Sequence, residues 1–314
     1  MTAALAEPSP ELIAAAQGEG MLTTIALPHS WCGYGEVIAA FKEKYGLEVN
    51  ELNSNAGSAD ELEAVKANKD NTGPQAPDVL DVGLSFGPAA KAEGLLQPYK
   101  VAEWDSIPDD AKDADGYWYG DYYGVLAFGV NSDIYPDAPT SFADMKADVF
   151  ANGVAIIGDP RTGNSTMMTV YAAGISEGAQ AGADALNKGI EYYNLLAMRD
   201  NLAGNPPVEV IVPSDAVVAG VYVQAISAYA PHPNAAKLWM EFLYSDEGQL
   251  LWLEGYCHPI RFNDMAERSA VPQDLLDKLP PAENYAKAIF PSLDDQAAAK
   301  KAVAVNWATE MGVQ

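Results

Sequence analysis

The sequence predicts an α/β protein built from two doubly wound units. The chain has 314 residues, which is enough for two domains of ordinary size. Its first third alternates short apolar runs with amphipathic helical segments, an order typical of a parallel sheet with helices on both faces. Strand patterns return after residue 200 without a low-complexity linker, so we expect strands to carry the chain between the units.

The elements of the first third follow from local patterns. Residues 21–27 are a short apolar run typical of a buried parallel strand, and Pro28 ends it. Residues 33–45 are predicted to form a helix because apolar side chains recur on one face. Strands are expected at 47–52 and 78–84, and helices at 87–93 and from Ser58, which Glu61 would complete as a capping box.

The rest of the chain repeats these signals. The aromatic stretch at 116–131 predicts a hairpin followed by a long strand. Further strands are expected at 153–160, 208–213 and 219–227, and helices at 162–174, 179–200, 233–244, 246–254 and 296–311.

Charge narrows the range of partners. The formal net charge is −26, from 44 acidic and 18 basic residues. Such a field repels phosphate backbones and anionic lipid, so neither nucleic acid nor a membrane surface is an expected partner. Direct membrane insertion is not expected either, because no apolar run approaches about 20 residues. The acidity fits a cationic ligand, but a solvating acidic surface is the simpler explanation.

The start of the chain and its two cysteines bear on the compartment. The first 20 residues have neither the basic nor the continuous apolar region of a signal peptide, so an exported protein would be represented here by its mature form with an added Met1. Cys32 and Cys257 have no CxxC spacing, which argues against a metal or redox motif. They form either one disulfide, given export to an oxidising space, or two inert thiols.

Motifs of catalysis are missing from the sequence. It contains no GxSxG elbow, HExxH, P-loop or GxGxxG, and its three histidines are not at metal-ligand spacing. We therefore expect no enzyme activity and no cofactor.

Three segments resemble one family. APHPNAAKLWMEFLYSDEGQ (230–249), DVGLSFGPAAKAEGLLQPY (81–99) and GYWYGDYYGVLAFGVN (116–131) are similar to segments of the extracellular solute-binding proteins of bacterial ABC transporters, in the iron and polyamine-type cluster. The resemblance covers nearly the whole chain. It implies the two-lobed type II periplasmic-binding-protein fold, in which each lobe is a mixed sheet flanked by helices and a ligand cleft lies between the lobes.

The resemblance also implies a domain division and partners. Lobe 1 would comprise residues 1–128 and 214–314, and lobe 2 residues 129–213. Family members carry a further loop, helix and strand where Tyr193 meets Asn194 here, so lobe 2 is expected to be shortened at that point. The expected protein is a periplasmic monomer that captures a small solute by lobe closure and docks on a membrane permease.

Candidate ligand contacts in lobe 1 follow from strand ends, because ligands of open α/β sheets bind beyond the carboxyl ends of strands. The loop after the first strand offers an aromatic surface for a ligand or cation, which could instead pack on the core. The third strand and its loop offer a carboxylate for an ammonium group, which could instead cap a turn. These candidates are Ser30, Trp31, Tyr34, Asp81, Ser85 and Phe86.

Candidate contacts in lobe 2 and its neighbouring segments suggest the other half of a ligand. The sequence GDPRTGNST predicts free N–H groups at a helix start beside a guanidinium, which together would form an anion pocket. An ordinary capped helix with a surface Arg is the alternative. The residues of the predicted anion pocket are Arg161, Gly163, Asn164 and Ser165. Tyr123 and Tyr222 are expected to form walls of the ligand site unless they pack in the core.

Together these groups suit a small zwitterion such as γ-aminobutyrate or an aminoalkylphosphonate, or else a polyamine. Ferric iron is the alternative ligand. Iron binders of this cluster use adjacent tyrosines in lobe 2, and Tyr192 with Tyr193 is such a pair, with His29 as a candidate partner.

Overall fold

The structure is a computed structural model that describes residues 7–151, 153–156, 158–176, 190–191, 207–277 and 289–312. The chain divides into two compact units, Met1–Tyr123 with Val221–Lys278 and Gly124–Gly220 with Leu279–Gln314. The chain enters the second unit within strand β5 (Tyr119–Asn131) and returns within strand β8 (Ala219–Ser227). These two crossings are therefore made by strands, as the lack of a linker predicts.

The observed division differs from the expected lobes at the C-terminus. The sequence assigns all of 214–314 to lobe 1, whereas the structure groups Leu279–Gln314 with the second unit. The physical reason is apolar packing. Val303 and Trp307 of helix α12 (Leu293–Met311) share a buried cluster with Val170 of helix α5 (Asn164–Ser176). The C-terminal helix therefore buries its apolar residues against the second unit.

The first unit contains parallel and antiparallel strand pairs. Strand β1 (Met21–Ile25) pairs in parallel with β2 (Glu48–Leu52). Strand β3 (Val79–Gly83) pairs antiparallel with β8, and the register places Asp81 opposite Gln224. Strand β8 lies between β3 and β5, β4 (Leu96–Gln97) adds to β8, and β9 (His258–Pro259) adds to β5. The first unit therefore combines a parallel pair, β1 with β2, and the antiparallel pairs that β8 and β5 form in a separate, larger sheet.

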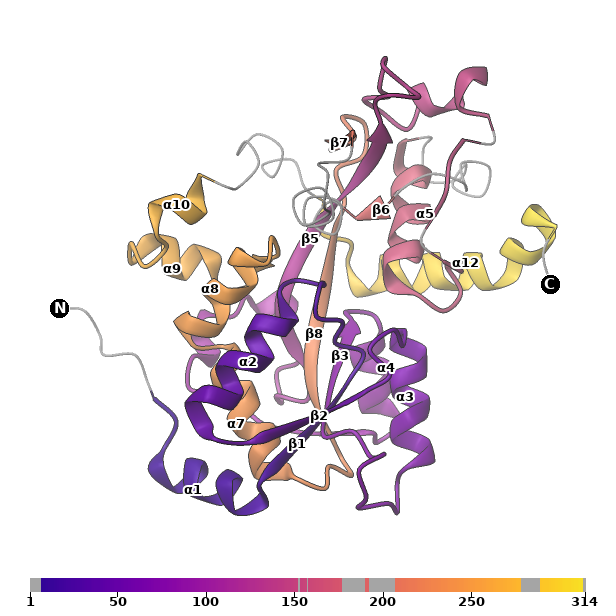
Figure 1. Cartoon of the computed structure of the whole chain (residues 1–314). Helices are drawn as coiled ribbons and strands as arrows, with labels where there is room; N and C mark the ends of the chain where they lie inside the picture. The colour runs from indigo at the N-terminus through magenta and orange to yellow at the C-terminus, as the bar shows by residue number, and fades with distance from the viewer. Residues whose placement is uncertain are drawn as a thin grey trace. The chain divides into compact units, whose positions relative to one another are not determined.

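Helices cover both sides of these strands. Figure 1 shows α3 (Ser58–Ala67) and α4 (Phe86–Ala92) on one side of β1–β3, and α2 (Tyr34–Tyr45) and α7 (Pro233–Leu243) on the other. This unit also contains α8 (Asp246–Glu254), α9 (Phe262–Glu267), α10 (Gln273–Leu276) and the 3₁₀ turns η1 (Trp104–Ser106) and η2 (Asp109–Ala111).

The sequence analysis missed helix α1 (Pro10–Glu19). Ser9 caps this helix by accepting the N–H of Leu12, and Gly20 ends it in the left-handed conformation. Its Glu19 carboxylate accepts the N–H groups of Asn234 and Ala235 at 2.9 and 2.8 Å, at the start of α7. A carboxylate at a helix N-terminus is stabilising, so α1 also fixes the start of α7.

The core between α2, α7 and α8 is aromatic. The ring of Phe41 on α2 lies 5.1 Å from Trp239 and 5.7 Å from Phe242, both on α7. These three side chains are fully buried. The apolar face that predicts the helix at 33–45 is thus the face that packs in the core.

The predicted capping box at Ser58 and Glu61 is wrong by one residue. Gly57 is the N-cap of α3, and its N–H is accepted by Asp60 at 3.0 Å. Ser58 and Glu61 instead turn toward β3, where they accept the N–H groups of Gly83 at 3.1 Å and Asp81 at 2.9 Å. The two side chains that the capping pattern assigns to the helix therefore form hydrogen bonds with the backbone of β3 instead.

The second unit is built around the later half of β5. Strands β6 (Ile190–Glu191) and β7 (Val208–Ile211) pair antiparallel with it, and η3 (Asp144–Lys146) and η4 (Asp148–Phe150) follow in the chain. Ile190–Glu191 is a strand rather than part of the helix expected at 179–200, whose other residues lie outside the described ranges. The strand expected at 153–160 is reduced, over the residues described there, to a single bridge at Ile156.

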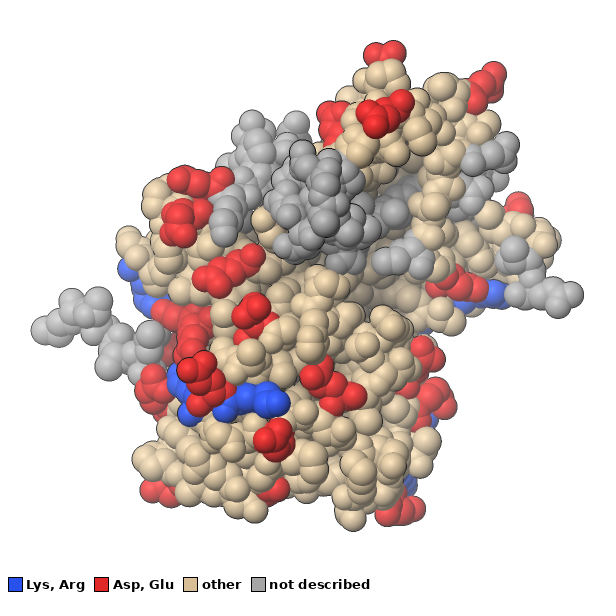
Figure 2. Space-filling view, viewed as in Figure 1, with Lys and Arg blue, Asp and Glu red and all other residues tan. Residues whose placement is uncertain are grey.

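The surface is strongly acidic. Figure 2 shows Asp and Glu side chains spread over this face of the molecule, with few Lys and Arg among them. Within the described ranges, no helix combines the length and the apolar character needed to cross a bilayer.

Candidate functional site

The candidate site of the first unit lies at the carboxyl ends of β1 and β3. The loop between β1 and α2 carries His29, Ser30 and Trp31. Tyr222 of β8 is opposite Gly83, the last residue of β3. The rings of Trp31 and Tyr222 meet edge to face, with centroids 5.8 Å apart. This is the edge of the sheet at which ligands of α/β proteins bind.

Three rings form an aromatic cluster here, which we define as Trp31, Tyr122 and Tyr222. Tyr122 stacks on Tyr222 with a centroid distance of 5.4 Å and an interplanar angle of 13°. Tyr122 is buried, whereas Trp31 and Tyr222 are partly exposed. Trp31 and Tyr222 are therefore the members of the cluster that a solute can reach.

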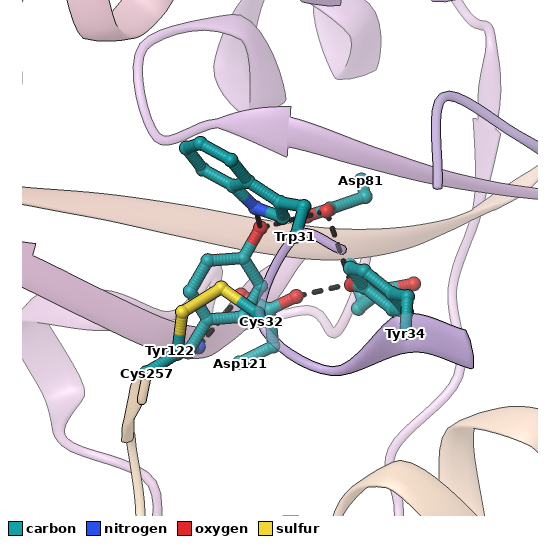
Figure 3. The surroundings of a disulfide bond; sticks show 8 residues. Trp31, Cys32, Tyr34, Asp81, Asp121, Tyr122 and Cys257 are labelled. Atoms are coloured by element: carbon teal, nitrogen blue, oxygen red, sulfur yellow. Dashed lines mark hydrogen bonds between the residues drawn. A yellow bond between two sulfur atoms is a disulfide. The ribbon is translucent and has the colours of Figure 1, made fainter. Parts of the chain in front are cut away.

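A chain of hydrogen bonds connects Trp31 to the interior. The indole Nε1–H of Trp31 donates to Tyr122 Oη at 2.7 Å, and the Tyr122 hydroxyl donates to Asp81 Oδ2 at 2.8 Å. The Tyr34 hydroxyl donates to the same carboxylate oxygen at 3.0 Å. Figure 3 shows these bonds converging on Asp81 beside the disulfide. The ring plane of Trp31 is thus tied to a buried carboxylate through one intermediate hydroxyl.

A second carboxyl group, that of Asp121, lies within the same network. Gln224 Nε2 donates to Asp121 Oδ2 at 3.0 Å and to Tyr34 Oη at 2.9 Å. Burial raises the pKa of Asp81 to about 7. Burial and the nearby Asp81 charge raise the pKa of Asp121 well above its ordinary value. Of the two neighbouring carboxyl groups, Asp121 therefore keeps its proton to the higher pH, because the Asp81 charge adds to the effect of burial on its pKa.

Glu61 adds a third buried carboxyl group to this region. Burial, together with the Asp81 charge, raises the pKa of Glu61 well above its ordinary value. A carboxyl oxygen of Glu61 accepts the N–H of Asp81. Since the pKa of Asp81 is raised to about 7, the charge of Asp81 changes near neutral pH.

A disulfide anchors the loop that carries Trp31. Cys32 is bonded to Cys257 with a Cα–Cα distance of 5.2 Å, so the disulfide alternative of the sequence analysis is confirmed. Gly255 lies against this loop, and a Cβ on it would come within 2.3 Å of the Cys32 carbonyl carbon. Only glycine permits that approach of the two backbone segments.

His258, which follows Cys257, packs against Tyr123. Its ring lies 4.5 Å from Tyr123 and 4.2 Å from Phe262. Burial lowers the pKa of His258 to about 3, so the imidazole is neutral. Tyr123, expected to wall the site, is partly buried beside this neutral ring.

The structure places several predicted contacts in the interior. Asp81 is only 4% exposed and receives two tyrosine hydroxyls, so it lies beneath the aromatic cluster rather than on the solute surface. Tyr34 is fully buried, with its ring 6.4 Å from Trp252. Phe86 is the first residue of α4 and belongs to a core cluster, not to an exposed loop. Packing between elements that are distant in sequence decides these positions, and local sequence patterns do not include it.

The smaller candidates of the first unit remain at the edge of the sheet. Ser30 is exposed on the loop after β1. Ser85 precedes α4 and is partly exposed, although its hydroxyl oxygen is buried. His29 is exposed and its Nε2 lies 2.6 Å from Glu51 Oε2.

In the second unit, the predicted anion pocket is partly filled by the chain itself. Arg161 Nε lies 2.9 Å from both carboxylate oxygens of Asp159, and the N–H of Gly163 donates to the Asp159 carbonyl at 3.2 Å. The side-chain hydrogen bonds from Arg161 lower the pKa of Asp159. Asn164 begins α5 and is buried, and Ser165 follows it, partly buried. The four predicted residues are thus adjacent, but the guanidinium charge is already balanced.

The iron alternative receives no support from the described part of the chain. Tyr192 and Tyr193 lie outside the described residues, as does the junction with Asn194. In the described ranges, no three His, Cys, Asp or Glu side chains are arranged to hold a metal ion.

Sequence reasoning missed Asp121 and Gln224. The signal that could have found them is one polar residue inside each of three apolar strands, namely Asp81, Asp121 and Gln224. Polar groups in buried strands are costly unless they are hydrogen-bonded, so three in neighbouring strands indicate a shared network.

Comparison with known proteins agrees with this fold. Residues 75–192 match the family described as bacterial extracellular solute-binding protein. The periplasmic binding protein AfuA from Actinobacillus pleuropneumoniae, solved with fructose-6-phosphate, has a TM-score of 0.72 and 19% identity, over 93% of this chain and 98% of that chain. No curated protein sequence matches this chain.

Two further solved structures are similar. The Atu4243-GABA receptor has a TM-score of 0.65 and 13% identity, over 92% of this chain and 97% of that chain. The ferric binding protein from Campylobacter jejuni has a TM-score of 0.59 and 17% identity, over 90% and 99%. The resemblance to extracellular solute-binding proteins and the two-lobed type II periplasmic-binding fold are thus confirmed. The ligands of these neighbours differ in chemistry.

Proposed function

We propose that this chain is the solute-binding protein of a bacterial ABC importer, and that Trp31 and Tyr222 receive a small amine-bearing solute. The observation that carries the proposal is the aromatic cluster at the strand ends of the first unit. Two partly exposed rings lie 5.8 Å apart above a buried carboxylate. Capture by lobe closure, docking on a permease and a periplasmic location are predictions drawn from the family resemblance.

The chemistry of the cluster favours a cationic group. The face of an indole or phenol ring is electronegative and attracts an ammonium group by about 0.5–2 kcal/mol, more when the contact is desolvated. The Asp81 carboxylate beneath Tyr122 adds negative charge at the same place. The net charge of −26 attracts cations to the whole molecule.

The other end of the solute is less defined. Arg161 is the residue that the sequence predicts for the anionic group of a zwitterion such as γ-aminobutyrate, but Asp159 already neutralises its guanidinium. The proposal therefore concerns the amine group of the solute. Whether the solute also needs an anionic group is tested by the choice of ligands in the screen.

A thermal-shift screen tests the solute class, because a ligand that binds only the folded state raises the melting temperature. The arms are γ-aminobutyrate, aminoethylphosphonate, putrescine, spermidine, fructose-6-phosphate and ferric citrate. We expect a shift with at least one amine. A shift confined to fructose-6-phosphate, or to ferric citrate with a visible iron–phenolate band, would replace the amine proposal.

Titration calorimetry with the amine that shifts the melting temperature then tests the surface. Trp31→Ala removes the ring and should weaken binding about tenfold or more, whereas Trp31→Phe keeps a ring and should lose less. Trp104→Ala is the matched control, since Trp104 is a partly exposed tryptophan of the same unit and packs against Tyr119 instead. Equal affinities for wild type and Trp31→Ala would show that the solute binds elsewhere.

A further inference from the structure

We propose that Asp81 is a positioning residue of the solute site, which holds the Tyr122 hydroxyl and, through it, the indole of Trp31. This inference rests on the proposed function, because Trp31 is the ring assigned to the solute. Asp81 itself is buried and has no place on the solute surface.

The direction of the hydrogen bonds supports this role. An indole nitrogen is a donor only, so Trp31 must donate to Tyr122. The single Tyr122 hydroxyl proton is then free for Asp81, and a carboxylate is an acceptor for both Tyr122 and Tyr34. Each bond thus requires the next, and the chain ends on the Asp81 carboxylate.

The backbone near Trp31 is held in place independently of these hydrogen bonds. The disulfide holds the neighbouring Cys32, and Gly255 packs against the same turn. The side-chain direction of Trp31 is left to its ring contacts and to the bond with Tyr122. Loss of that bond would therefore change the ring orientation without unfolding the loop.

The groups that face Asp81 are all neutral or acidic. They come from the elements packed around it, and they are Tyr34 on α2, Glu61 on α3, Asp121 and Tyr122 on β5, Tyr222 and Gln224 on β8, and Tyr244 after α7. Burial among them raises the pKa of Asp81 to about 7. The orientation of Trp31 should therefore respond to pH near neutrality, because a charged acceptor holds a hydroxyl more strongly than a neutral carboxyl group does.

¹⁹F NMR of protein labelled with 5-fluorotryptophan tests this without a solute. The Trp31 resonance is the one missing from Trp31→Phe, and its shift is followed from pH 5 to pH 9. In wild type we expect a titration with a midpoint near pH 7. In Asp81→Asn, whose neutral amide replaces the carboxylate at nearly equal size, we expect no titration of that resonance.

Two further variants separate the groups involved. Tyr122→Phe breaks the link at its middle and should also flatten the Trp31 titration, which decides the question if Asp81→Asn does not fold. Glu61→Gln keeps an acceptor for the Asp81 N–H and should retain the titration. A wild-type Trp31 resonance that does not move with pH, or one that still titrates in Asp81→Asn or Tyr122→Phe, overturns the proposal.

A binding arm then distinguishes this inference from the proposed function. With the amine found by the screen, wild type should bind about threefold or more tightly at pH 8 than at pH 6, and Asp81→Asn should show no such change. If Trp31 follows Asp81 by NMR but no amine binds, the positioning of Trp31 stands and the amine site falls. If an amine binds with the same pH profile in both proteins, Asp81 does not act on the solute.

Discussion

Removal of the Cys32–Cys257 disulfide should destabilise the first unit by about 3–5 kcal/mol. The perturbation is the double variant Cys32→Ala with Cys257→Ala, which leaves no free thiol. Both sulfur atoms are buried, and the bridge joins the loop after β1 to the segment between α8 and β9. The disulfide thus connects two parts of the unit that are remote in sequence.

The magnitude follows from the length of chain that the bridge closes. The sequence separation is 225 residues, for which the loop-closure entropy of the unfolded chain corresponds to about 5 kcal/mol at 25 °C. Treating Gly124–Gly220 as a folded insert shortens the effective loop but lowers the figure by only about 0.5 kcal/mol, because the dependence is logarithmic. Residual structure in the unfolded state reduces the measured value, hence the lower end of the range.

Urea unfolding followed by circular dichroism measures the effect. The midpoint of the double variant should lie about 1–2 M below that of wild type. Wild type in excess reductant, once fully reduced, should approach the midpoint of the variant, which itself should not respond to reductant. Coincident midpoints for the oxidised wild type and the variant would refute the loop-closure reasoning.

Three other outcomes are expected. Gly255→Ala should lower the melting temperature, since its Cβ would lie 2.3 Å from the Cys32 carbonyl carbon, whereas Gly18→Ala, with open space around it, should be neutral or stabilising. Arg261→Met should cost about 3–5 kcal/mol in urea unfolding, because the fully buried guanidinium forms ion pairs with three carboxylates and each of these pairs would be lost; a loss below 1 kcal/mol would contradict this. Because burial raises the folded-state pKa of Asp81 to about 7, above its unfolded value, its contribution to stability is present at low pH and is lost as pH rises through 7. Between pH 5 and pH 8 wild type should therefore lose about 2–3 kcal/mol more stability than Asp81→Asn, and parallel urea profiles for the two proteins would exclude this linkage.

Most regular elements could be predicted from sequence because their signals are local. The strand expected at 219–227 and the helix expected at 246–254 match β8 and α8. Helix α1 was missed although its signals are present, with Ser9 as N-cap, Pro10 in the first turn and Gly20 at the end. The run at 153–160 has strand composition, but composition cannot show whether a partner strand lies beside it.

The sequence predicts that the candidate site lies at the strand ends, but it does not predict which of the candidate residues are buried. The rule that ligands bind beyond strand ends identifies the loop of Trp31 correctly as the edge of the sheet. The burial of Asp81 depends on its register opposite Gln224, and Gln224 in turn reaches Asp121, 103 residues away in sequence. Such pairings depend on tertiary structure, so a carboxylate expected to meet the solute lies one layer below it.

The two side chains that α3 directs at β3 have a consequence for self-association. Glu61 and Ser58 occupy the N–H groups of Asp81 and Gly83, which point away from β8. An extended segment that added to this flank would have to displace both side chains from these two donors. The occupied donors therefore disfavour self-association by strand addition at this flank of β3.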